Sequence, residues 1–227
     1  MTAGPYPGEV DLDWENQYRI IPSRFPPVNF FEAMVDPALM DELFYIESLT
    51  NDRLRQEAGE ISLVPVDDRI SGPGSTPLMA AFTHSGCDSR FSDGSFGIYY
   101  AANSQETAIA ETRYHRAKFL NDTNEDAGEI DMRVYIGEVV RPMHDIRSSV
   151  YDFLHHPDDY KPSQAFGLEL KQLHSWGLVY RSVRRTEGLC IAALRAPAIS
   201  IPRQGPHLSY YWDGKTISEV FEKTLIS

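Results

Sequence analysis

Residues 89–111 read SRFSDGSFGIYYAANSQETAIAE, and the fold of the chain can be worked out from this stretch. The tetrapeptide Ser92-Asp93-Gly94-Ser95 is a cluster of turn-forming residues. Residues 96–102 are aromatic and apolar, as in a buried strand. Asn103 is a good helix N-cap, and Glu106 three residues later completes a capping-box-like pair. The stretch therefore predicts a turn, a strand and then a helix over 105–120.

Glu111 stands about two turns into that helix, next to Ala108, Ile109 and Ala110. A carboxylate among small apolar side chains needs a reason, because burial of an unpaired charge is costly. One reason is chemistry on a ligand. The other is an ordinary helix pair with His115 four residues on, and the residues alone leave both open.

The bulk properties indicate one soluble, acidic domain. The chain has 227 residues, of which 42% are hydrophobic, and its formal net charge is −12. This charge argues against direct nucleic-acid binding, which depends on phosphate neutralisation by Lys and Arg. A local basic patch is compatible with it, because Arg181, Arg184 and Arg185 lie close together in the sequence. No signal peptide opens the chain and no apolar run approaches membrane-helix length, so we expect a cytoplasmic protein that does not contact a membrane.

The two cysteines, Cys87 and Cys190, do not form a secreted disulfide framework. Cys190 lies in an apolar run typical of a buried strand. His84-x-x-Cys87 has no second pair at zinc spacing, so no metal is expected.

The remaining segments predict an α+β fold with mixed, largely antiparallel sheets and flanking helices. The first 16 residues form a flexible N-terminal arm, and residues 17–227 form one domain with a helical insertion at about 28–78, where Asp36-Pro37 starts a helix. Strands are expected at 18–21, 61–66, 132–140, 178–180 and 189–194, and amphipathic helices at 163–175 and 218–226.

Five pieces of this sequence, in this order, resemble the RES-domain family. They are Tyr18-Arg19, Arg90-Phe91, Tyr100, Glu111, and Ser182 within the run 177–184. The resemblance covers about residues 17–200, and the insertion is longer than in compact RES toxins. It implies a fold like that of ADP-ribosyltransferase toxins, cleavage of NAD as substrate with no further cofactor, and membership of a bacterial toxin–antitoxin pair.

The resemblance also implies the roles of six residues. Glu111 would stabilise the cation that forms on the ribose, with Arg19 and Tyr100 as further catalytic residues. Arg90, Ser182 and Tyr18 would bind the substrate. Arginine suits a diphosphate, because its planar fork makes paired hydrogen bonds to phosphate oxygens.

Each of these residues also has an ordinary interpretation. Arg19 could be a surface residue beside an edge strand, and Arg90 could pair with Asp88 or Asp93 in its turn. Tyr100 could pack in the core, and Ser182 could simply end a strand. Because neighbouring strand residues point to opposite faces, only one of Tyr99 and Tyr100 can line a pocket, and the family register favours Tyr100.

The acceptor of the ADP-ribose group stays open. Water would make the protein an NAD glycohydrolase, phosphate would make it an NAD phosphorylase, and a macromolecule would make it an ADP-ribosyltransferase. A non-catalytic interaction module is the alternative outside enzymes. The resemblance further implies a helix-turn-helix antitoxin as partner. A homodimer is expected from the apolar face formed by Val220, Phe221 and Leu225, although these residues could equally cover the protein's own core.

Overall fold

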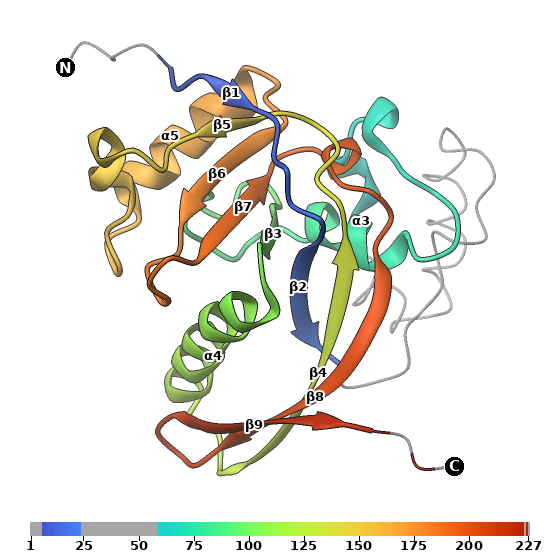
Figure 1. The fold of residues 1–227 in the computed structure, drawn as a ribbon, viewed down its shortest axis with the longest axis vertical. Helices are drawn as coiled ribbons and strands as arrows, with labels where there is room; N and C mark the ends of the chain where they lie inside the picture. The colour runs from blue at the N-terminus through green and yellow to red at the C-terminus, as the bar shows by residue number, and fades with distance from the viewer. Residues whose placement is uncertain (1–5, 24–58, 225, 227) are drawn as a thin grey trace.

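A computed structural model describes residues 6–23, 59–224 and 226. Within them the strands form one sheet in the order β1-β5-β6-β7-β3-β2-β4-β8-β9 (Figure 1). All neighbours pair antiparallel except β5 and β6, which are parallel. The predicted α+β class with a largely antiparallel sheet is confirmed. The strands are β1 Glu9–Val10, β2 Gln17–Pro22, β3 Tyr99–Ala102, β4 Gly128–Gly137, β5 Met143–Asp145, β6 Gly177–Arg181, β7 Leu189–Ala193, β8 Arg203–Trp212 and β9 Ile217–Lys223.

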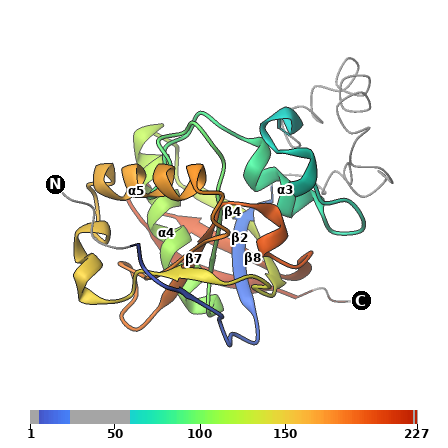
Figure 2. The ribbon, with the colours of Figure 1, turned by 90° about the horizontal axis from the view of Figure 1, so that it is seen from above.

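Three α-helices flank the sheet in the described part of the chain: α3 Thr76–Thr83, α4 Gln105–Asp122 and α5 Lys161–Gln172. Short 3-10 helices lie at η2 Ile61–Leu63, η3 Val66–Asp68, η4 Ser149–Leu154 and η5 Ala196–Ala198. Helix α4 packs against β2, β3 and β9, whereas α3 packs against β3, η2 and η5. The view from above shows α4 and α5 running over the same side of the sheet (Figure 2).

Alternation along the central strands divides the core into two clusters. In β3, Tyr100 and Ala102 face one cluster while Tyr99 and Ala101 face the other. The same alternation places Cys190 of β7 in the first cluster and its neighbour Ile191 in the second. Both faces of the middle of the sheet are therefore buried.

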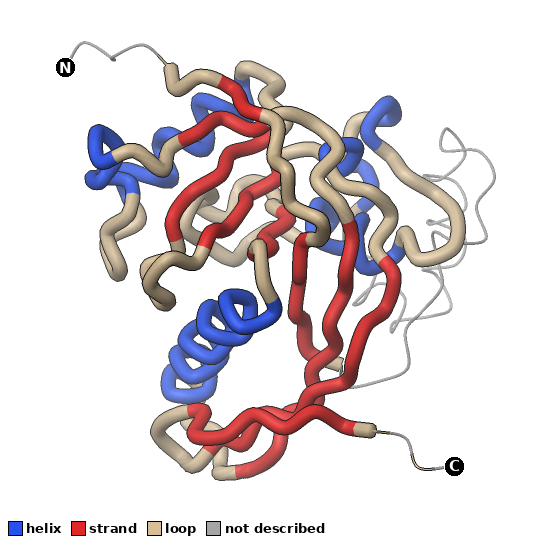
Figure 3. Tube along the Cα trace, viewed as in Figure 1, coloured by secondary structure: helices blue, strands red, loops and turns tan. Residues whose placement is uncertain are grey.

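The sheet separates between β2 and β3. Strand β2 pairs with β4 along its whole length, but it meets β3 only where Tyr18 lies opposite Ala102. Beyond that point the two strands diverge, and the tube in Figure 3 shows α4 on the open side between the two parts of the sheet. A separation of this kind leaves room for a cavity.

The C-terminal helix predicted over 218–226 is wrong, because residues 217–223 form β9 at the edge of the sheet. Val220 packs against the core, whereas Phe221 is 51% exposed. Leu225 lies outside the described residues. The apolar helical face from which a homodimer was expected therefore does not exist.

The strand predicted at 61–66 is also wrong. These residues form η2 and the start of η3. Pro65 has no backbone N–H to donate to a ladder and instead precedes the second turn. The helix predicted at Asp36-Pro37 lies outside the described residues, as does most of the proposed 28–78 insertion.

The described part of the predicted N-terminal arm is fixed at the sheet edge. Glu9 and Val10 pair with β5, and the carbonyl of Gly8 accepts a hydrogen bond from the backbone N–H of Asp145 at 2.9 Å. The free edge of β5 gives this polar segment backbone partners, which its composition could not reveal.

The helix after β3 is confirmed, but its cap lies one residue later than predicted. Ser104 is the N-cap, and its hydroxyl accepts the N–H of Thr107 at 3.2 Å. Asn103 pairs instead with Leu189, accepting the Leu189 N–H at its side-chain oxygen and donating its own N–H to the Leu189 carbonyl. Asn103 thereby prolongs the contact between β3 and β7 up to the helix start.

Candidate active site

A cavity of about 460 Å³ opens where β2 and β3 diverge beneath α4. This volume suits a small molecule with several polar groups. Its walls come from β2, the 87–90 turn, β3, α4, Tyr160, β6 and β7. The lining residues include Tyr18, Arg19, Cys87, Asp88, Ser89, Arg90, Tyr100, Ala108, Glu111, Thr112, His115, Lys118, Phe119, Tyr160, Tyr180 and Cys190.

The structure brings the six residues predicted from the sequence together. Five line the cavity, namely Tyr18, Arg19, Arg90, Tyr100 and Glu111. The sixth, Ser182, follows β6 and contacts the cavity through Glu111. Tyr18 and Ser182, which are 164 positions apart in the chain, are thereby brought to the same cavity.

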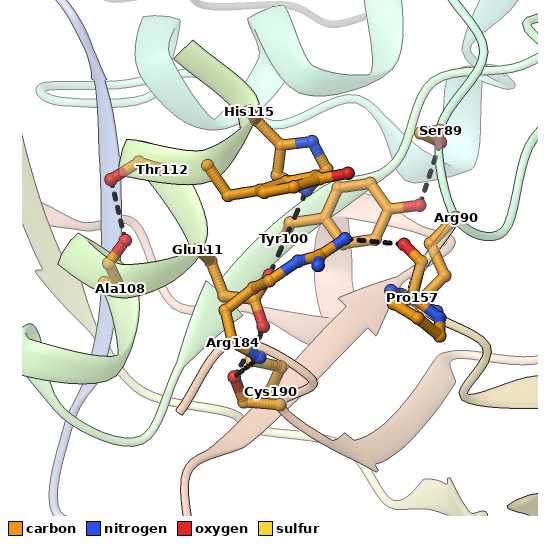
Figure 4. Close-up of polar contacts among 12 residues, drawn as sticks. Ser89, Arg90, Tyr100, Ala108, Glu111, Thr112, His115, Pro157, Arg184 and Cys190 are labelled. Atoms are coloured by element: carbon orange, nitrogen blue, oxygen red, sulfur yellow. Dashed lines mark hydrogen bonds and ion pairs between the residues drawn. The ribbon is translucent and has the colours of Figure 1, made fainter. Parts of the chain in front are cut away.

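Glu111 projects from α4 into the cavity, and its side chain is 16% exposed (Figure 4). Its Oε1 accepts a hydrogen bond from the Ser182 hydroxyl at 2.6 Å. Its Oε2 lies 3.9 Å from Nε2 of His115, one helical turn on. The helix pair considered from the sequence is thus present at long distance, while the shorter contact comes from Ser182.

The Ser182 hydroxyl is held from both sides. Its oxygen accepts the backbone N–H groups of Arg184 and Arg185 at 3.1 and 3.0 Å. These two donors leave the hydroxyl proton to point at Glu111. The turn after β6 therefore fixes one carboxylate oxygen, while Oε2 makes the longer contact with His115.

Arg19 lies inside the molecule rather than on a surface beside an edge strand. Its Nη1 donates to the Tyr100 carbonyl at 3.1 Å, and its guanidinium lies 4.6 Å from the centre of the Tyr99 ring. Its Nε is buried without a hydrogen-bond partner. Burial lowers the pKa of this guanidinium from its ordinary value, with the nearby tyrosines opposing the change.

Arg90 is only 5% exposed and forms no pair with Asp88 or Asp93. Its Nη1 donates to the His156 carbonyl at 2.8 Å, and its guanidinium stacks on the Tyr160 ring at 4.7 Å. Its Nη2 is buried without a partner. Two guanidinium-bearing side chains therefore lie in the walls of one cavity, and guanidinium groups match the geometry of phosphate oxygens.

Tyr100 lines the cavity with its ring, while Tyr99 is fully buried on the other face. The Tyr100 hydroxyl accepts the Phe91 N–H at 3.0 Å and shares a 2.9 Å hydrogen bond with the Ser89 hydroxyl. Burial raises its pKa to about 12. The hydroxyl therefore keeps its proton at physiological pH and fixes the 89–91 turn that carries Arg90.

The cavity residues that were not identified from the sequence as site residues include His115, Tyr160, Tyr180 and Cys190. The helical spacing from Glu111 to His115 was visible and could have suggested His115 as a site residue. Burial raises the pKa of Tyr180 and of the Cys190 thiol well above their usual values, so both stay protonated. Tyr160 precedes α5 and no sequence pattern marks it, because only the fold brings it to Arg90.

Among residues 6–23 and 59–224, no three His, Cys, Asp or Glu side chains gather closely enough to hold a metal ion. None of the helices in that part of the chain is long and apolar enough to cross a membrane.

One solved structure similar to this chain is the crystal structure of the M. tuberculosis MbcT-MbcA toxin-antitoxin complex. The match covers 92% of this chain and 87% of the other, with a TM-score of 0.43 and 15% sequence identity.

The sequence comparisons are more direct. The chain is 31% identical over 206 residues to "Uncharacterized protein y4oC" of Sinorhizobium fredii (strain NBRC 101917 / NGR234), which covers 90% of this chain and 86% of that protein. The RES domain model matches residues 67–213, a segment that contains Arg90, Tyr100, Glu111 and Ser182 but not Arg19. The resemblance seen in the sequence is confirmed, and this chain belongs to the RES domain family.

Proposed function

We propose that the protein cleaves the bond between nicotinamide and ribose in NAD, within the cavity described above. One observation carries the proposal: the Glu111 carboxylate lines the same cavity as Arg19 and Arg90, whose guanidiniums each keep a buried donor without a partner. NAD needs this combination, because it joins a reactive glycosidic carbon to a diphosphate.

The chemistry places particular demands on the carboxylate. Nicotinamide leaves as a neutral base, so the leaving group needs no general acid. Positive charge develops on the ribose, as in glycoside hydrolysis. A preorganised negative charge beside that carbon stabilises the transition state. Glu111, fixed at one oxygen by Ser182, supplies this charge with little reorganisation.

The two arginines hold the other end of the substrate. Diphosphate oxygens accept paired hydrogen bonds from guanidinium groups. The guanidinium groups of Arg19 and Arg90, both residues of the cavity wall, would supply the donors for this contact. Tyr18 and the ring of Tyr100 then offer flat surfaces against which the nicotinamide or ribose can pack.

The acceptor is water, giving an NAD glycohydrolase, or phosphate, giving an NAD phosphorylase. Transfer of ADP-ribose to a macromolecule is the alternative reaction in the same cavity. A module that only binds partners is the alternative without catalysis, and the grouping of Arg19, Arg90 and Glu111 around one cavity speaks against it.

The wider role is that of a toxin in a toxin–antitoxin pair, acting on NAD in the cytoplasm. An enzyme that consumes NAD without control would drain its own cell. A helix-turn-helix antitoxin is the expected inhibitor, and the net charge of −12 would speed its encounter with a basic partner. A homodimer remains part of this proposal, although the residues from which it was expected, Val220 and Phe221, lie on strand β9 and not on a helix.

The direct test is nicotinamide release from NAD by the wild type and by Glu111→Gln. The substitution keeps the size of the side chain and removes its charge, so we expect activity to be abolished while the circular dichroism spectrum is unchanged. Glu129→Gln is the matched control, because Glu129 also accepts a hydrogen bond from a serine, Ser209, at 2.9 Å outside the cavity.

More than about a tenth of wild-type kcat in Glu111→Gln, equivalent to a loss under ~1.4 kcal/mol, would contradict the assignment. Product analysis with and without phosphate separates ADP-ribose from ADP-ribose 1″-phosphate. A wild type that releases no nicotinamide but binds a partner tightly would favour the non-catalytic module.

A further inference from the structure

His115 lies beside the carboxylate on the same face of α4. It lines the cavity one helical turn after Glu111, and its Nε2 is 3.9 Å from Oε2 of that residue (Figure 4). This separation is too long for a direct hydrogen bond. An oxygen atom of a ligand or water can lie within about 3 Å of both atoms at once.

We infer that His115 is a catalytic base that takes the proton from the acceptor water when NAD is hydrolysed in this cavity. The inference rests on the proposed function and deepens it. An acceptor oxygen that contacts both Nε2 of His115 and Oε2 of Glu111 would lie close to the carbon whose positive charge Glu111 stabilises. A base must lie within hydrogen-bond reach of the proton that it removes, and this arrangement provides that reach.

The imidazole is positioned by its neighbours. The ring of Tyr114 meets it edge-on, with centroids 5.3 Å apart. Tyr114 in turn lies under the Arg184 guanidinium at 3.3 Å and donates its hydroxyl to Asp158 at 2.7 Å. The side chain of His115 is nevertheless 50% exposed, so a proton taken from the acceptor can pass on to solvent.

The charges around His115 favour its neutral form. Desolvation of the part of the ring that faces the protein lowers its pKa from the ordinary value, and Glu111 opposes this change. Arg184 from the turn after β6, Arg90 from the turn before β3, and Arg116 from α4 itself each lower the pKa further. The cavity walls also carry the charged or titratable side chains of Asp88, Lys118, Asp122 and Tyr160.

The sign of the pH dependence follows directly. A base acts in its neutral form, which predominates above its pKa. Hydrolysis should therefore be retained at neutral and alkaline pH and should fall as the pH drops through the pKa of His115, which is lowered from the usual histidine value.

The reaction balances without another reactant. The bond from ribose C1′ to the nicotinamide nitrogen breaks, and its electron pair leaves with neutral nicotinamide. The water oxygen bonds to C1′, one water proton moves to Nε2 of His115, and the imidazolium then releases it to solvent. The products are ADP-ribose, nicotinamide and one proton.

An anionic acceptor separates this role from a structural one. Azide is anionic at neutral pH and attacks C1′ without losing a proton, so it needs no base. Water and azide compete for the same ribosyl cation. The ratio of ADP-ribose to azide adduct therefore measures how well the enzyme activates water. It does so whichever step limits the rate of nicotinamide release.

The experiment compares the wild type with His115→Gln, using NAD with and without azide across a pH series. We expect the variant to form ADP-ribose about a hundredfold more slowly, which is the lower end of what a general base contributes. The azide adduct should form at close to the wild-type rate, and the fall in hydrolysis at low pH should disappear. His207→Gln on β8 is the control, because that histidine lies outside the cavity and should behave as wild type.

Two results for a folded His115→Gln would overturn the inference. One is an unchanged product ratio with an unchanged pH profile. The other is an equal loss of ADP-ribose and azide adduct, which would indicate a positioning role. Absence of nicotinamide release from the wild type would instead overturn the proposed function and this inference together.

Discussion

Nη1 of Arg19 donates a hydrogen bond to the backbone carbonyl of Tyr100 at 3.1 Å, joining β2 to β3 just beyond the point where their pairing stops. The guanidinium thus occupies part of the space that ladder hydrogen bonds would fill in a continuous sheet. This contact holds Arg19 at the cavity wall and still leaves its Nε without a protein partner. One side chain thus joins the two strands and lines the cavity.

We expect Arg19→Ala and Arg90→Ala to weaken NAD binding more than they alter folding. Each removes a charged donor to the diphosphate, and such a loss costs about 1.5–3 kcal/mol. Titration calorimetry in a Glu111→Gln background measures the affinity without turnover, and denaturant unfolding measures the stability.

Arg147→Ala is the control for this pair, because Arg147 forms a surface ion pair with Asp145 and does not line the cavity. Unchanged affinity in both variants would exclude the two arginines from the binding site. Unchanged affinity in Arg90→Ala alone would limit Arg90 to supporting the wall at His156 and Tyr160.

Ser182→Ala should lower kcat while leaving KM for NAD almost unchanged. The hydroxyl fixes Oε1 of Glu111, and loss of a hydrogen bond to a charged group of about 1.5–3 kcal/mol corresponds to roughly a tenfold to hundredfold slower turnover. Steady-state nicotinamide release gives both constants. Ser209→Ala, which breaks the comparable bond to Glu129, should retain wild-type kcat. A large rise in KM with kcat intact would instead make Ser182 a substrate ligand.

Tyr100→Phe should destabilise the protein by about 1–3 kcal/mol, because it leaves the Phe91 N–H without its acceptor. Since the ring remains, NAD affinity should fall less than in Tyr100→Ala. Urea unfolding and calorimetry test the two parts separately, with the partly exposed Tyr211→Phe as control. The pKa of about 12 also means that no change in activity below pH 10 should come from ionisation of Tyr100. Equal stability of Tyr100→Phe and wild type would contradict the anchoring role.

Asp68→Ala should destabilise the fold by about 3 kcal/mol, the lower end for breaking a buried pair, because Arg195 keeps some contact with solvent. Asp68 accepts hydrogen bonds from both Nε and Nη2 of Arg195, and the same guanidinium lies over the Trp176 ring at 4.1 Å. The exposed neighbour Asp67 provides the matched control, since Asp67→Ala should change the free energy of unfolding by less than about 0.5 kcal/mol. Coincident urea transitions for the two variants would refute the importance of this ion pair.

The strands in the middle of the sheet were predictable because their sequences are apolar on both faces or alternate. Residues 189–194 and 178–180 carry that signal, and both are strands in the structure. The prediction of a helix in place of strand β9 failed for a physical reason. It is an edge strand with a register shift between Tyr211 and Trp212 of its neighbour β8, so its buried residues do not alternate cleanly. Without that period, Val220 and Phe221 fit a helix as well as a strand.

The grouping of the candidate site residues around one cavity was predictable from the family motif, but their contacts were not. The family motif named Glu111 and Ser182, yet their 2.6 Å hydrogen bond joins residues 71 positions apart. The partners of Arg19 and Arg90 are backbone carbonyls at Tyr100 and His156, and a carbonyl carries no sequence signal. Only the pairing of strands and the path of the loops determines which carbonyl faces which guanidinium.

The separation of the sheet at β2 has a consequence for anyone who shortens this chain. Strand β2 is the only ladder connection, within the described part of the chain, between the group β1-β5-β6-β7-β3 and the group β4-β8-β9. It lies ahead of the segment 67–213 that the family model matches. A fragment cut to that match would keep most residues of the motif and lose the strand that makes the two groups one sheet. Strands β3 and β4 would each expose a bare edge, and such edges recruit other chains into aggregates.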